Sequence, residues 1–246
     1  MTDDAQAARR DVQARLAAAM RWFAALDFDE GAAGHLSARD PVEPDCFWIN
    51  AVGRPFDIAT PASLVLVDRH GAVRAGEGSP SRAGFELHSA IYAARDDVGS
   101  AMHAHPVHAK AWSTLGRLLD PITQEACIFH GRHGLFDEYN APFSDHSEAE
   151  RVVAALGPSH IAMILRNHGL LTLGPSVGSA AYRFMIFDRS CRVQLLAEGA
   201  GDPMRIDEGV ASWLSNDERH SHDSFEPIFE SMRTRFPEIV AVEAPA

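Results

Sequence analysis

Short apolar segments with strand character alternate with amphipathic helical segments along most of this chain. Residues 5–26 place Val12, Leu16, Met20 and Phe23 at steps of three and four, the periodicity of a helix with one buried face. Helices are also predicted over 83–95, 107–116, 147–156 and 177–200, and strands within 34–41, 46–50, 64–75, 101–104, 121–130 and 160–169.

This alternation constrains the fold class. Several strands are joined by hairpin-like turns, such as the one expected at 68–71, so the pattern predicts an α/β sheet with helices on both faces and not a Rossmann crossover series. The 246 residues are 46% hydrophobic, enough to bury a full core, and no linker or internal repeat divides them. We expect one domain over residues 1–246, with a charged helical C-terminal tail from about 203.

Charge and cysteine usage exclude several classes of protein. A formal net charge of -12 without a basic run disfavours nucleic-acid binding. The N-terminus lacks a signal-peptide core and no stretch reaches membrane-spanning length, which predicts a soluble, cytoplasmic protein without a membrane partner. Cys46, Cys127 and Cys191 form no CxxC pair, which disfavours a disulfide framework or a thiolate zinc site.

Three histidines form a candidate metal site. His103 and His105 lie two apart in MHAHP at the end of an expected strand, where alternate side chains share a face. Pro106 should end that strand and place the pair at a sheet edge. His168 lies between two apolar runs, and Gly169 permits a sharp turn or close backbone approach there. Three imidazoles with open positions are typical of a catalytic metal.

The alternative is a chance pair of histidines on a solvated strand end, because HxH alone is a weak motif. The third histidine favours the metal, since a lone buried histidine beside an edge strand as apolar as 161–165 would need a partner. The residues alone leave both interpretations open.

With these residues the sequence resembles the class II aldolase and adducin head-domain family. The resemblance covers about residues 20–198, and its most specific blocks are AMHAHP and RNHGLLTLG. The other matching blocks are GHLSARDP (34–41), INAVG (49–53), LVLVDRHGAVRAGEG (64–78), the segment 82–106 and PITQEACIFHG (121–131).

The resemblance implies a three-layer α/β/α fold with a largely antiparallel central sheet. It also implies a divalent metal on His103, His105 and His168; zinc is the ion we expect, with manganese or iron as alternatives. Similar enzymes are homotetramers with active sites between subunits.

One departure from the family bears on the reaction. Similar sugar-phosphate aldolases carry a catalytic glutamate four residues before the histidine that matches His88, and here that place holds Gly84. Glu86 lies two residues further along the helix and should face roughly 200 degrees away, so the role does not transfer to it. The RAGF sequence is closer to the adducin-like bacterial branch, which includes decarboxylase-like proteins and proposed oxygenases. His88 is either a core histidine or a residue that orients a ligand.

Several residues match the turns that hold the anionic end of the substrate in similar aldolases. Arg82 in place of a serine would favour a carboxylate, although Ser81 and Arg82 could simply begin a helix. His35 could hydrogen-bond the substrate or brace its loop. The predicted substrate-binding residues are His35, Ser37, Asn50, Gly53, Ser81 and Arg82.

Tyr139 and His146 are the candidates for proton transfer at the reacting centre, although the sequence gives no geometry for either. His130 and His133 would share a face only in a helix, which Gly131 and Gly134 disfavour. Loop histidines are more often structural or exposed.

These features support one main hypothesis and two alternatives. The main hypothesis is a metal-dependent lyase that cleaves a small hydroxy- or oxo-acid, by aldol cleavage or decarboxylation, through a metal-stabilised enolate. Its partner would be a small-molecule carboxylate or phosphate substrate. The alternatives are a non-haem iron oxygenase on the same fold and a non-catalytic, adducin-like interaction domain.

Overall fold

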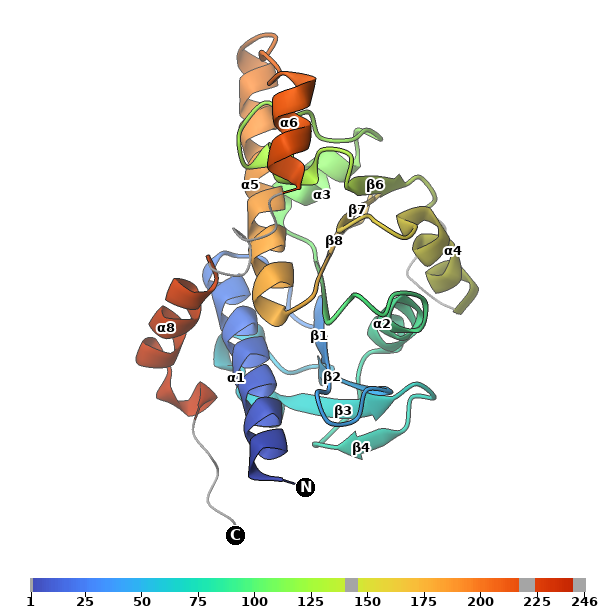
Figure 1. Cartoon of the computed structure of the whole chain (residues 1–246), viewed down its shortest axis with the longest axis vertical. Coiled ribbons are helices and arrows are strands. Elements are labelled where there is room, and N and C mark those ends of the chain that lie inside the picture. Colours follow the sequence, from blue (N-terminus) through green and yellow to red (C-terminus); the bar gives the residue numbers. More distant parts are fainter. Residues whose placement is uncertain (1, 140–145, 217–223, 241–246) are drawn as a thin grey trace.

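A single mixed sheet forms the centre of the computed structural model, which describes residues 2–139, 146–216 and 224–240 (Figure 1). Within these residues the strand order is β4-β3-β2-β1-β5-β8-β7-β6. Neighbouring strands are antiparallel, apart from the parallel pair β6 and β7, which confirms the largely antiparallel sheet. The strands are β1 (His35–Arg39), β2 (Cys46–Asn50), β3 (Leu64–Asp68), β4 (Val73–Ala75), β5 (Ser100–Ala104), β6 (His133–Phe136), β7 (Ala162–Leu165) and β8 (Gly169–Gly174).

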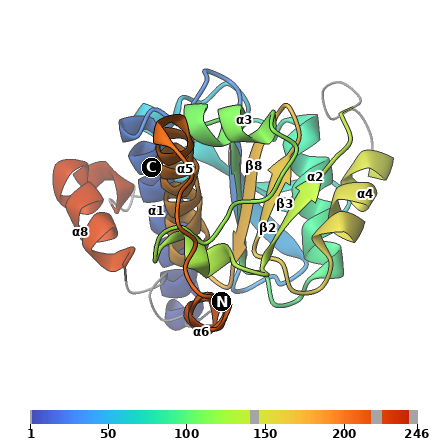
Figure 2. The same ribbon diagram turned by 90° about the horizontal axis from the view of Figure 1, so that it is seen from above.

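Helices cover both faces of this sheet, as Figure 2 shows from above. Helices α1, α3 and α5 lie on one side, and α2 and α4 lie on the other, so the three-layer α/β/α prediction is confirmed. The helices are α1 (Asp3–Ala25), α2 (Arg82–Ala94), α3 (Val107–Ser113), α4 (His146–Leu156), α5 (Val177–Ala200), α6 (Glu208–Ser215) and α8 (Glu226–Arg235); the short 3-10 turns are η1 (Phe56–Ile58), η2 (Pro61–Ser63), η3 (Ala126–Phe129) and η4 (Pro237–Ile239).

The strands bury side chains on both faces, because successive residues of a strand point to opposite sides. In β2, Trp48 joins the core beneath α1 and α5, whereas Phe47 and Ile49 join the core beneath α2 and α4. Two separate apolar cores therefore hold the layers together. In β1 the same alternation directs Leu36 toward α1 and leaves His35 and Ser37 on the α2 side.

One predicted element is wrong. The strand expected within 121–130 is instead the 3-10 turn η3. Thr123 explains the difference: its hydroxyl accepts from the N–H of Ala126 at 3.2 Å, and its carbonyl accepts from the N–H of Cys127. These local bonds turn the backbone and compete with strand pairing.

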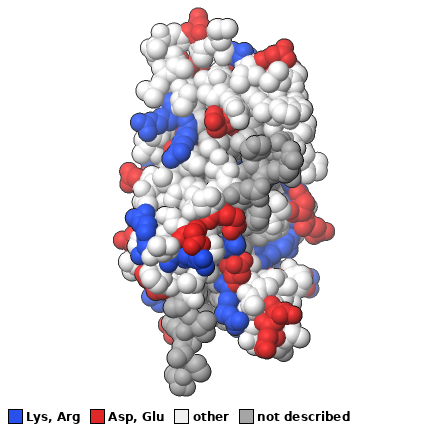
Figure 3. All heavy atoms as spheres, turned by 60° about the vertical axis from the view of Figure 1, so that its left-hand side comes forward, with Lys and Arg blue, Asp and Glu red and all other residues white. Residues whose placement is uncertain are grey.

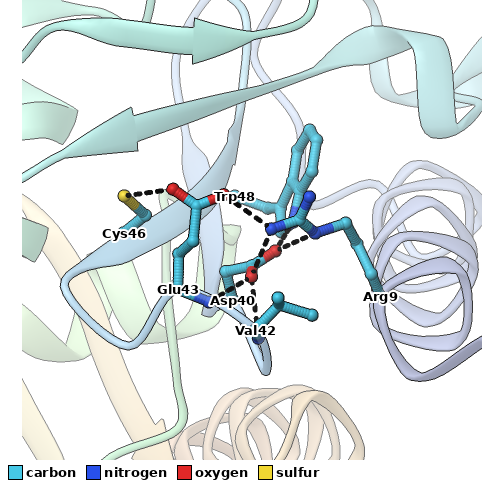
Figure 4. Close-up of polar contacts among 6 residues, drawn as sticks. All are labelled: Arg9, Asp40, Val42, Glu43, Cys46 and Trp48. Carbon is cyan, nitrogen blue, oxygen red and sulfur yellow. Dashed lines mark hydrogen bonds and ion pairs between the residues drawn. The ribbon is translucent and has the colours of Figure 1, made fainter. Parts of the chain in front are cut away.

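A buried carboxylate fastens α1 to the loop between β1 and β2 (Figure 4). Asp40 accepts two bonds from the Arg9 guanidinium, at 2.7 and 2.8 Å, and one from the Trp48 indole at 2.7 Å. The backbone N–H groups of Val42 and Glu43 donate to the same carboxylate. These donors hold the pKa of Asp40 below its usual value, against the opposing effect of burial. The arrangement fixes the end of β1 opposite His35.

The C-terminal helix α8 packs against α1 (Figure 1). The Phe225 ring, at the N-cap of α8, lies 5.9 Å from that of Trp22, and Arg15 forms an ion pair with Glu226 at 2.6 Å.

Acidic and basic side chains are interspersed on the side of the molecule that faces the viewer in Figure 3. In the part of the chain that the structure describes, no helix is both long and apolar enough to cross a membrane.

Candidate metal centre and active site

The three predicted metal ligands converge at one end of the central strands. His103 lies in β5, His105 follows that strand directly, and His168 lies in the turn between β7 and β8. Antiparallel pairing of β5 with β8 sets His103 opposite Leu171 and brings that turn to the end of β5. The ligand nitrogens of the three histidines all lie within 4.8 Å of one another, which could accommodate one metal ion.

The strand positions differ from the sequence prediction in one respect. Strand β5 lies between β1 and β8, and β7 lies between β8 and β6, so neither is an edge strand. The site is at the ends of central strands instead. Gly169 is needed for this approach, because a Cβ atom there would lie 2.8 Å from the Ala104 carbonyl oxygen and 2.9 Å from the His105 ring.

Polar contacts orient the imidazoles of His103 and His105. The Nδ1 of His103 lies 3.0 Å from the carbonyl oxygen of Leu170, an acceptor, so this nitrogen carries the proton. The Nδ1 of His105 faces a carboxylate oxygen of Glu30 at 3.4 Å. Glu30 is itself held by the ammonium of Lys110. In both rings the Nε2 lone pair is therefore free for a metal ion.

The three ligands are neutral at neutral pH. Burial lowers the pKa of His103 well below its usual value and that of His168 to about 4. Burial also lowers the pKa of His105, although Glu30 opposes the shift. Neutral imidazole is the form that binds zinc and other first-row divalent ions, so the donor set fits such an ion.

A chain of four buried polar side chains leads to this site. The Nδ1 of His35 lies 2.7 Å from Nε2 of His88, and the Nδ1 of His88 bonds to the Ser37 hydroxyl. The Ser37 hydroxyl also lies 2.7 Å from the hydroxyl of Tyr92. Burial lowers the pKa of His88 to about 3, so His88 is neutral. At the other end, the His35 ring centroid lies 4.7 Å from that of His103.

At Gly84, the position of the expected glutamate, the His35 ring occupies the space that a side chain would enter. Gly84 lies in the first turn of α2, where a Cβ atom would be 3.0 Å from Cγ of His35 and 2.9 Å from Oγ of Ser81. Ser81 is the N-cap of α2 and accepts from the Gly84 N–H at 3.0 Å. Arg82 follows on the exposed surface, and Glu86 is half-buried.

Asn50 and Gly53 lie near the same end of the sheet. The Asn50 amide accepts from the N–H of Leu36 at 2.9 Å and donates to the carbonyl of Gly34 at 3.3 Å, so both of its ends are used by the backbone that precedes and follows His35. Gly53 adopts a φ of 75°, a conformation that glycine favours. Asn50 thus fixes the backbone on both sides of His35, at the start of β1.

The remaining candidates differ in their surroundings. Tyr139 is 50% exposed, and the side chain of His146, the first residue of α4, lies outside the described residues. His133 is buried and bonds to the carbonyl of Phe129 and the N–H of Leu119. His130 pairs with Glu208 at 2.9 Å. His133 therefore has the structural role expected of such histidines.

Two residues of the site were absent from the sequence prediction. Tyr92 follows His88 by four residues on α2, a spacing that places two side chains on one helix face and could have indicated their link. Glu30 comes from the loop after α1, and only tertiary pairing brings it to His105, so no local pattern indicates it.

A comparison with protein families assigns the chain to a known family. The Class II Aldolase and Adducin N-terminal domain family matches residues 14–195, and the chain belongs to that family. The matched region includes the three histidines and all four members of the polar chain.

Individual relatives carry the names of different reactions. The chain is 37% identical over 235 residues to Decarboxylase NovR of Streptomyces niveus, covering 93% of this chain and 86% of that protein. It is also 37% identical to 4-hydroxy-3-prenylphenylpyruvate oxygenase/4-hydroxy-3-prenylbenzoate synthase of Streptomyces roseochromogenus subsp. oscitans, with coverage of 94% and 85%. The solved structure of L-fuculose 1-phosphate aldolase from Glaciozyma antarctica PI12 matches with a TM-score of 0.89 at 35% identity, covering 98% and 96% of the two chains.

Proposed function

We propose that this protein is a metal-dependent carbon-carbon lyase that acts on a small hydroxy- or oxo-acid. The observation that carries the proposal is the set of three neutral histidines whose ligand nitrogens converge within 4.8 Å. His103, His105 and His168 would hold a divalent ion, zinc in our proposal and manganese or iron otherwise, which would supply Lewis-acid stabilisation of the negative charge that bond cleavage leaves on the substrate.

The chain's own residues would bind and orient the substrate. His35 and Ser37 belong to the buried chain beside the histidines, and Ser81 and Arg82 begin the helix that carries His88. We propose that the exposed guanidinium of Arg82 pairs with a carboxylate or phosphate of the substrate. Asn50 and Gly53 shape the adjoining loops. Tyr139 and His146 remain predicted proton-transfer residues.

Gly84 favours decarboxylation over sugar-phosphate aldol cleavage. Without a carboxylate at this position, a substrate that loses carbon dioxide needs no base to begin its reaction, whereas aldol cleavage begins by removing a hydroxyl proton. The relative named as a decarboxylase supports this choice, and the relative named as an oxygenase supports iron-dependent oxidation as the second candidate. We further propose a cytoplasmic homotetramer; a non-catalytic, adducin-like module is a third candidate.

Metal analysis of His103→Ala tests the site. Protein purified without added metal should contain one divalent ion per chain, and the variant should lose it, whereas His70→Ala, at the exposed β3–β4 turn, should keep it. Full retention at wild-type stoichiometry in His103→Ala would rule out the site. Anaerobic reconstitution with zinc, manganese or iron, followed by oxygen-uptake and carbon-dioxide release assays, distinguishes oxygenase from lyase.

A further inference from the structure

The buried polar chain has a direction, because each member has a limited number of protons. It runs from Tyr92 through Ser37 and His88 to His35. The Ser37 hydroxyl has two of these partners but only one proton. It must accept from one and donate to the other.

The hydroxyl of Tyr92 fixes the donor-to-acceptor direction of these hydrogen bonds. If Ser37 donated to Tyr92, the phenol proton would have to find another acceptor, and the buried surroundings of Tyr92 offer none among its described contacts. Buried hydroxyl protons are nearly always bonded. Tyr92 therefore donates to Ser37, and Ser37 donates to Nδ1 of His88.

The same reasoning continues through the two imidazoles. A neutral His88 that accepts at Nδ1 carries its proton on Nε2 and donates it to Nδ1 of His35. A neutral His35 that accepts at Nδ1 must then carry its own proton on Nε2. Among the hydrogen bonds of the described residues, His35 takes part through Nδ1 and not through Nε2, and its ring lies beside that of His103.

We infer that His35 is a fixed hydrogen-bond donor to an anionic oxygen of the substrate, with its tautomer set by Tyr92 through Ser37 and His88. The inference rests on the proposed function, because the substrate oxygen is the one that three histidines and their ion would hold nearby. A donor at this position recognises a carboxylate or an enolate oxygen and disfavours a protonated amine.

Gly84 makes room for this donor. Because a Cβ atom at Gly84 would lie 3.0 Å from Cγ of His35, a larger residue would move the ring. The loop side supports the same placement, since the Asn50 amide holds the backbone on both sides of His35. The position of the His35 imidazole is therefore fixed by its contact with Gly84 of α2, by the Asn50 amide and by the hydrogen bond at its own Nδ1.

Nitrogen NMR of the metal-free protein labelled with nitrogen-15 histidine tests the tautomer directly. We expect His35 to carry its proton on Nε2 in the wild type. In Tyr92→Phe the Ser37 hydroxyl no longer accepts a hydrogen bond from Tyr92, so it can rotate and accept from Nδ1 of His88 instead. The His88 tautomer then reverses, and the Nδ1-protonated form of His35 should gain population. Tyr182→Phe, on α5 beneath the opposite face, should leave the spectrum of His35 unchanged. A wild-type His35 protonated on Nδ1, or no change in Tyr92→Phe, would overturn the inference.

Binding of oxalate to the zinc-loaded protein tests the donor role. His35→Leu should weaken oxalate binding by roughly tenfold or more, whereas His35→Gln, whose amide can donate from a similar position, should recover most of the loss. Unfolding curves and zinc content of each variant verify the fold and the metal. Equal oxalate affinity in wild type and His35→Leu would refute the donor role. If the wild type itself failed to bind zinc, the proposed function would be refuted, whereas the tautomer of His35 measured by NMR would still be valid.

Discussion

The Nε2 atoms of His103 and His105 lie 3.1 Å apart, and each ring turns its Nδ1 away toward an oxygen. Two neutral imidazoles arranged in this way bring two lone pairs together, which is unfavourable without a cation between them. A tetrahedral zinc ion with Zn–N bonds of about 2.0–2.1 Å separates its nitrogens by roughly 3.3 Å. The pair is therefore close to ligand geometry before an ion binds.

Glu30 should tune the affinity of this site. Its carboxylate faces Nδ1 of His105 and orients that ring, so Glu30→Gln should weaken zinc binding by about tenfold to a hundredfold. Competition with a chromophoric chelator measures the affinity. Asp29→Asn is the matched control, since it removes a charge from the adjacent residue, and it should change the affinity by less than about threefold. An equal effect of both substitutions would show that Glu30 acts only through its charge.

Much of this architecture could be predicted from local sequence patterns. The periodicity of residues 5–26 predicts α1, whose bounds are Asp3–Ala25, and the apolar run CFWIN coincides with β2. Such segments form where the pattern of burial is regular. The segment around Thr123 could not be predicted in this way, because side-chain hydrogen bonds turned an apolar stretch away from strand pairing.

The candidate site was predicted only as far as its motifs extend. The spacing of His103 and His105, with His168, indicates a metal, but the order of the central strands follows from long-range pairing. The close approach of His35 to Gly84 could not be predicted either, since β1 and α2 are separated by more than forty residues. From the sequence alone, a glycine within a predicted helix indicates only lower helix stability.

Gly84→Ala should separate helix stability from site geometry. Alanine favours a helix by roughly 0.5–1 kcal/mol over glycine, but here its Cβ would meet Cγ of His35 at 3.0 Å. We expect the variant to gain no stability in denaturant unfolding and to bind oxalate more weakly. Gly199→Ala, in α5 with nothing within 4 Å of the added Cβ, should gain about 0.5–1 kcal/mol and leave binding unchanged. Equal stabilisation by Gly84→Ala and Gly199→Ala would mean that the His35 ring can move aside at no cost in free energy.

Asp40→Asn should be strongly destabilising. The substitution replaces a carboxylate that accepts from Arg9, Trp48 and two backbone N–H groups with an amide that turns one donor toward them. We expect a loss of about 2–4 kcal/mol in the free energy of unfolding, measured in urea. Glu43→Gln alters the more exposed partner of Arg9 and should cost less than about 1 kcal/mol. Similar losses in both variants would contradict the central role of Asp40.

His133 should make the protein less stable in acid. Burial lowers its folded pKa to about 4 from an ordinary 6.5, and neutral His133 donates from Nδ1 to Phe129 and accepts at Nε2 from Leu119. Between pH 6.5 and 4 the unfolded chain binds the additional proton, so stability falls by up to about 3 kcal/mol as pH decreases, and no further below pH 4.

His133→Gln tests this dependence in urea unfolding at a series of pH values. Glutamine does not titrate, so the variant should be less stable than the wild type at pH 7 but should lose less stability on acidification. The difference in unfolding free energy between the two proteins should therefore shrink as pH falls from 6.5 to 4. His70→Gln, at the exposed β3–β4 turn, should follow the wild-type curve. A constant difference between His133→Gln and wild type across this range would show that His133 is not a source of acid sensitivity, because other buried histidines act equally in both proteins.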